Sequence, residues 1–160
     1  MKIDSVLREL HRSENELARH LLDVSERNKA DHETHHLARD LATWSQRHVR
    51  ALAEAGERFG VKLDPKPAEE SSLTQRVREK AGERIGRHGT GDLLMLRDLR
   101  KIYTDASGVS IDWEMLAQAA QALKDAELLK LVQDCHPDTL RQMRWANAKL
   151  KEASPQVLVS

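Results

Sequence analysis

The chain has 160 residues, and its 26 lysines and arginines are balanced by 26 aspartates and glutamates. That length suits one domain, residues 1–160. The zero net charge provides no basic excess for nucleic acid. The single cysteine, Cys135, excludes an internal disulfide and favours a reducing, cytoplasmic location. No run approaches the roughly 20 apolar residues of a membrane span, so neither nucleic acid nor a membrane is an expected partner.

The composition predicts an all-α protein, because it is rich in helix-forming residues and has only one phenylalanine and one tyrosine. The first expected helix runs from Asp4 to about Arg27. Its apolar residues follow a heptad spacing, in which Glu14 fills one inward position. A carboxyl group is therefore expected on the buried side. The apolar positions are Leu7, Leu10, Leu17, Leu21 and Val24.

The second expected helix covers Asp31 to Gly60, with Asp31 as its cap and Gly60 as a left-handed stop. Apolar and small residues recur at helical spacing, and His48 interrupts their row, which predicts an imidazole pointing toward the core. A short turn near residue 30 predicts an antiparallel hairpin, which would bring Glu14 opposite His48. The row is Leu37, Leu41, Trp44, Leu52, Ala55 and Phe59.

Residues 61–91 are expected to form a long crossover, because they contain two prolines and many turn-forming residues. Within it, Leu73 to Arg87 has the pattern of a short, highly charged amphipathic helix. Such a connection carries the chain between opposite ends of some four-helix bundles.

The next expected helix begins with Asp92 as its cap and continues to Leu123. Helical phase persists across Gly108, so the choice lies between one helix and a break that restarts at Ser110 or Asp112. The unbroken phase favours one helix. The inward positions would be Leu93, Leu96, Leu99, Tyr103, Ala106, Val109 or Ser110, Trp113, Leu116, Ala120 and Leu123.

The last expected helix runs from Ala126 to Glu152, and Pro137 is expected to kink it near Asp134. Beyond it, the tail SPQVLVS is expected to fray or to dock loosely. A second histidine, His136, falls within its apolar row. The row is Leu129, Val132, His136, Leu140, Met143, Asn147 and Leu150.

The stretches HLARDLATWSQRHVRALAEAGERFG and WEMLAQAAQALKDAELLKLVQDCHPDTLRQMRWANAKLKE resemble the second helix and the third-to-fourth helix hairpin of small bacterial ferritin-like domain proteins. The resemblance implies an antiparallel four-helix bundle with a long crossover. It also implies inward glutamates on two helices and a glutamate–histidine pair, one turn apart, on each of the other two, together holding two metal ions.

Carried over residue by residue, the resemblance assigns Glu14 to the first-helix glutamate and His48 to the second-helix histidine. Ser45 stands where a carboxylate is expected. Asp105 or Asp112 would supply the third helix. In the fourth, Thr139 and Gln142 occupy the ligand positions, and His136 is offset by one turn. The implied metal site is therefore Glu14, His48 and His136, for iron, manganese or zinc, and it is incomplete.

Glu14 and His48 admit two interpretations: a buried hydrogen-bonded pair that fixes helix register, or members of that metal site. His32 and His36, one helical turn apart, form a second candidate metal site at the surface, for which a solvated polar face is the alternative. The sequence has three tryptophans at helical spacing, which is typical of a hydrophobic core; the alternative is that they line a cofactor pocket. They are Trp44, Trp113 and Trp145.

The sequence contains no glycine-rich phosphate loop, nucleophile elbow or paired-cysteine zinc spacing, so enzymes of those classes have no support. Cys135 is expected to be a small buried hydrophobe. The favoured function is a non-catalytic binding or structural protein that self-associates through bundle faces. The alternative is a metal-binding protein in redox or stress chemistry. Charged residues expected outside are Arg12, Arg19, Arg39, Arg47 and Glu57.

Overall fold

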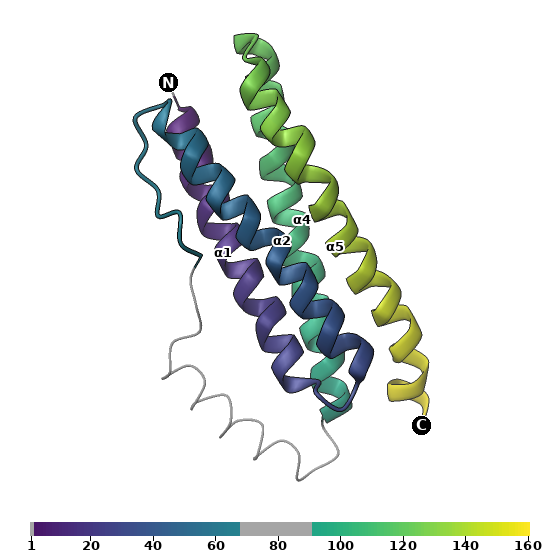
Figure 1. Cartoon of the computed structure of the whole chain (residues 1–160). Coiled ribbons are helices and arrows are strands. Elements are labelled where there is room, and N and C mark those ends of the chain that lie inside the picture. Colours follow the sequence, from purple (N-terminus) through teal and green to yellow (C-terminus); the bar gives the residue numbers. More distant parts are fainter. Residues whose placement is uncertain (1, 68–90) are drawn as a thin grey trace.

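Long helices dominate the computed structural model, which describes residues 2–67 and 91–160 (Figure 1). Within these ranges the chain forms four helices and no strand, which confirms the all-α prediction at this level. The predicted helix over Leu73 to Arg87, and most of the predicted crossover 61–91, lie outside the described residues.

The first two helices, α1 (Ile3–Arg27) and α2 (His32–Glu57), form the predicted antiparallel hairpin (Figure 1). The Asp31 carboxylate caps α2 by accepting a 3.1 Å hydrogen bond from the Thr34 backbone N–H. Beyond the other end, Gly60 adopts a left-handed φ of 68°, and the Val61 N–H donates to the Gly56 carbonyl at 2.9 Å. Both predicted helix signals are confirmed.

The third described helix, α4 (Gly91–Leu123), continues through Gly108, which confirms the single-helix prediction. Its inward face is wrongly predicted at three positions. Leu93, Tyr103 and Leu123 were expected inside and are 47%, 40% and 45% exposed, whereas Ile102 is fully buried. The helix meets α1 along its middle, so its inward face at residue 102 is set by that neighbour.

The last helix, α5 (Ala126–Val159), is longer than predicted, because it continues past Glu152 and through Pro155 instead of fraying. Its buried face is also displaced by about one residue from the expected apolar row. Leu140 is exposed, and three polar residues point inward instead. The buried residues are Leu128, Val132, Cys135, Thr139, Gln142, Ala146, Lys149 and Ala153.

Contacts at the two ends fix the order of the helices in space. Arg58, just after α2, pairs with Asp125 in the α4–α5 turn at 2.8 Å. At the other end, Arg27 of α1 pairs with Asp98 near the start of α4, also at 2.8 Å. Therefore α2 ends at the opposite end of the molecule from the start of α4 (Figure 1).

The core draws on all four described helices, and leucine and alanine are its commonest residues. None of the described helices is long and apolar enough to cross a membrane. The charged residues expected on the outside are all exposed: Arg12, Arg19, Arg39, Arg47 and Glu57.

Candidate functional site

A carboxyl group and an imidazole meet inside the bundle, as predicted. Glu14 of α1 is completely buried and His48 of α2 is 3% exposed. His48 Nδ1 lies 2.8 Å from Glu14 Oε1, which is hydrogen-bond distance. Both residues interrupt an apolar row, and the hairpin aligns the two interruptions. The pair is therefore a consequence of helix phase and the short turn between α1 and α2.

A third helix reaches the same carboxyl oxygen. Trp113 of α4 is fully buried, and its indole Nε1–H donates to Glu14 Oε1 at 3.0 Å. The Trp113 ring also stands edge-on to the His48 ring, with centroids 6.0 Å apart. Trp113 is thus core, as predicted, and in addition a polar partner of Glu14.

The fourth helix closes the network through Asp138. Its Oδ2 lies 3.1 Å from His48 Nε2, so both ring nitrogens of His48 face carboxyl groups. On its outer side, Asp138 pairs with Arg141 at 3.1 Å and with Arg47 at 3.7 Å. The network therefore runs from the buried Glu14 outward to two exposed guanidiniums.

This arrangement favours the doubly protonated imidazole. Burial, the strongest single influence, lowers the pKa of His48, but the carboxyl groups of Glu14 and Asp138 together raise it above its ordinary value. Carboxylate oxygens accept hydrogen bonds, so both contacts are satisfied when both ring nitrogens donate. An imidazolium has no free lone pair, and metal ligation would require its deprotonation.

A layer of neutral polar side chains lies beside this network. Ser45, Thr139 and Gln142 are each fully buried. The Gln142 amide donates to Ser45 Oγ and to the Leu41 carbonyl, both at 2.9 Å. These three residues occupy the positions that the ferritin-like resemblance assigns to metal ligands. Within this layer and at Glu14, three buried oxygens have no hydrogen-bond partner: Glu14 Oε2, Thr139 Oγ1 and Gln142 Oε1.

His136, the third residue of the predicted metal site, has a different partner. Its Nε2 lies 2.8 Å from Ser110 Oγ on α4, so the structure pairs it with a hydroxyl and not with Glu14 or His48. Across residues 2–67 and 91–160, no three or more His, Cys, Asp or Glu side chains are grouped so that they could hold a metal ion.

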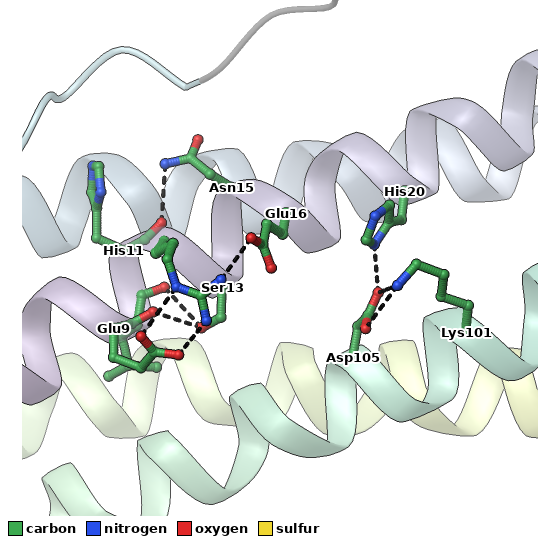
Figure 2. A network of polar contacts seen from close by, with 10 residues as sticks. Glu9, His11, Ser13, Asn15, Glu16, His20, Lys101 and Asp105 are labelled. Atoms are coloured by element: carbon green, nitrogen blue, oxygen red, sulfur yellow. Dashed lines mark hydrogen bonds and ion pairs between the residues drawn. The ribbon is translucent and has the colours of Figure 1, made fainter. Parts of the chain in front are cut away.

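The third-helix carboxylates considered from the sequence also lie elsewhere. Asp105 contacts His20 of α1 and Lys101, in a partly exposed cluster between α1 and α4 (Figure 2). Burial, the strongest influence, raises the pKa of Asp105, but His20 and Lys101 reverse the effect and lower it overall. For Asp112, burial and then Glu9 raise the pKa. The α4 side chain that reaches Glu14 is Trp113 instead.

The second candidate metal site, at the surface, consists of two imidazole rings in contact. His32 and His36 are both exposed, and their centroids lie 4.3 Å apart in an edge-to-face arrangement. Elsewhere, Trp44 and Trp145 are half-buried and pack against the core. Cys135 is buried as predicted, and burial raises the pKa of its thiol to about 12, so the thiol is inert at neutral pH.

Sequence reasoning missed Asp138 as a member of the site, and it missed the hydrogen bond from Trp113. Asp138 directly precedes the buried Thr139. The predicted apolar row instead turned His136 and Leu140 toward the core, which left Asp138 away from the inward face. A helix phase drawn through Thr139 and Gln142, the positions given by the resemblance, would have placed Asp138 at the edge of the buried face of α5, without identifying its partner.

No family model, curated protein or solved structure matches this chain.

Proposed function

We propose that this chain is a ferritin-like bundle protein with a binding or structural role, in which the positions of a di-metal site hold an ion-paired polar layer. The ferritin-like assignment is supported by the sequence resemblance and by the placement of Glu14, Ser45 and His48 on the buried side of one hairpin. We infer a non-catalytic role from the burial of Glu14 and His48, which are 0% and 3% exposed.

One observation carries this proposal: both nitrogens of His48 are engaged by carboxyl groups, at 2.8 and 3.1 Å. A metal at this histidine would need a nitrogen lone pair that these contacts do not leave. The buried network instead fixes the relative positions of α1, α2, α4 and α5, because each contributes one member. A shift of any one helix along its axis would break a buried hydrogen bond of this network, so the network disfavours changes in helix register.

The test is metal determination on protein purified without a chelator or a histidine tag. We expect far less than one metal ion per chain and a melting temperature that a chelator leaves unchanged. Near-stoichiometric iron, manganese or zinc that is lost in Glu14→Gln would overturn the proposal. Nitrogen NMR of the His48 ring is the second measurement, and protonation of both ring nitrogens near neutral pH is expected.

A metal-binding function in redox or stress chemistry is the second candidate, because three buried oxygens at the implied ligand positions lack hydrogen-bond partners. Its metal would be iron, manganese or zinc. The His32–His36 pair is a separate surface candidate, and removing both histidines should abolish any ion binding there while leaving the fold intact.

Self-association and a cytoplasmic location complete the proposal. On α4, Ile111 and Met115 are 57% and 50% exposed and lie one turn apart, which supports contact with a second copy. The buried, unreactive Cys135 is compatible with a reducing compartment. A solution mass that falls from dimer to monomer in Ile111→Glu would support self-association, and a monomeric wild type would contradict it.

A further inference from the structure

An apolar groove lies between the start of α4 and the end of α5. It is open to solvent and has a volume of about 450 Å³, and its accessible lining is almost wholly apolar. None of its walls comes from α1 or α2, so the groove is on the side of the α4–α5 hairpin turned away from the ion-paired layer. The lining residues are Leu93, Leu94, Leu96, Arg97, Arg100, Leu150, Ser154 and Leu158.

The groove exists because α5 continues past Pro155. This last part of the helix carries Leu158, which is 65% exposed, opposite Leu93 of α4, which is 47% exposed. Terminal turns usually fray unless contacts hold them, and exposed leucines add no stability in water. An ordered wall of leucine that faces solvent is typical of a surface that an apolar ligand covers.

Two arginines on the groove wall have no carboxylate partner among residues 2–67 and 91–160. Arg97 and Arg100 are exposed, lie one turn apart on α4, and make no side-chain ion pair within the described part of the chain. On the other side of the same helix turn, Arg27 is neutralised by two bonds to Asp98, at 2.8 and 2.9 Å. The positive charge at the groove is therefore available to a ligand.

We propose that this groove binds a single-chain anionic amphiphile of the fatty-acid class. Its alkyl chain would lie along the leucines, and its carboxylate would meet the guanidiniums of Arg97 and Arg100. The volume lies within the range of small-molecule sites, about 300 to 1,000 Å³. A second copy of the chain fits less well, because a two-fold contact across this groove would bring the arginines of both copies together.

The experiment titrates the full chain by calorimetry with saturated carboxylates of increasing length, each below its micelle concentration. One bound chain per protein is expected, with Kd falling about fourfold per added methylene until the groove is filled. The alcohol of equal length should bind more weakly, and added salt should weaken only the carboxylate. An affinity independent of chain length would overturn the proposal.

Variants separate the two halves of the site. The double variant Arg97→Gln with Arg100→Gln should weaken carboxylate binding several-fold and leave the alcohol unchanged. Leu158→Glu, at an exposed position, should weaken both ligands. The matched control is Leu140→Glu, an exposed apolar residue of the same hairpin outside the groove, which should bind like wild type.

Three results contradict the assignment. Binding that is unchanged in both the arginine double variant and Leu158→Glu would place the ligand elsewhere. A dimer that Leu158→Glu dissociates would identify a second copy as the occupant, and binding only to anionic vesicles would identify a membrane surface. Circular dichroism of each variant confirms that a loss of binding does not come from unfolding.

Discussion

At the scale of single residues, the stability of this protein depends on how a buried charge is compensated. Glu14 has no exposure to solvent, so its partners must come from the protein. His48 and Trp113 supply them from two other helices. Removal of one member therefore costs more than the lost bond, because the remaining carboxyl group stays buried.

We predict that His48→Ala lowers the free energy of unfolding by about 3 kcal/mol, because it breaks a buried pair and leaves a cavity. Urea denaturation provides the measurement. The control is Arg39→Gln, at an exposed ion pair with Glu26, which should change stability by less than about 0.5 kcal/mol. An unchanged midpoint in His48→Ala would mean that Glu14 finds other partners.

The contact between His48 and Glu14 also predicts that the stability of the protein depends on pH. The folded-state pKa of His48 is raised above the unfolded value of about 6.5. Its contribution to stability is therefore complete below about pH 6.5 and is lost as the pH rises through the folded-state pKa. Melting temperatures from pH 6 upward, compared between wild type and His48→Gln, should converge as the pH increases. A constant difference over that window would contradict the assignment of a charged His48.

Glu14 and His48 could be predicted as partners because each is a polar residue inside an apolar row. Asp138 and Trp113 could not, since periodicity fixes which face a residue takes on its own helix and not which atoms it meets on another. Asp138 also lies at the edge of the buried face, where apolar patterning carries little information.

At the scale of helices, glycine positions test the backbone assignments. Gly60 has a φ of 68°, where a side chain is unfavourable, so Gly60→Ala should destabilise the protein by about 1 kcal/mol. Gly108 lies inside α4, and an added Cβ there would meet nothing within 4 Å. Gly108→Ala should therefore stabilise by roughly 0.5 to 1 kcal/mol. Thermal denaturation of the two variants checks the opposite signs, and a stabilising Gly60→Ala would contradict the left-handed stop.

Helix identity and most helix boundaries could be predicted from apolar spacing and from caps such as Asp31. The rotation of α5 could not. Its apolar row predicted that Leu140 and Met143 point inward. Thr139 and Gln142 point inward instead, and the Gln142 amide donates to Ser45 on α2. Hydrophobic patterning misplaces a helix whose inward face is partly polar. The end of α5 was also missed, because the tail beyond Glu152 was expected to fray, whereas the helix continues through Pro155 to Val159.

At the scale of the whole molecule, α2 and α5 touch less closely than the other neighbouring helices, and polar side chains bridge them. His48 and Asp138 form the inner bridge. Lys149 forms an outer one near the start of α2, where its Nζ lies 3.3 Å from Glu33 and 3.5 Å from Asp31. The two bridges differ in how well their carboxylates reach water.

We predict that Lys149→Met changes the free energy of unfolding by less than about 1 kcal/mol, although the Lys149 side chain is only 8% exposed. Its partners Asp31 and Glu33 are 36% and 60% exposed and remain hydrated without it. Methionine also keeps the apolar contacts of the lysine stem.

Urea denaturation of Lys149→Met beside His48→Ala provides the comparison, because the partners of Lys149 are solvated, whereas His48 also pairs with the fully buried Glu14. The His48 variant should be less stable by at least about 2 kcal/mol. Equal losses would mean that the charge of Lys149 itself holds α5 against α2. The inner bridge would then no longer be the main polar connection between the two hairpins.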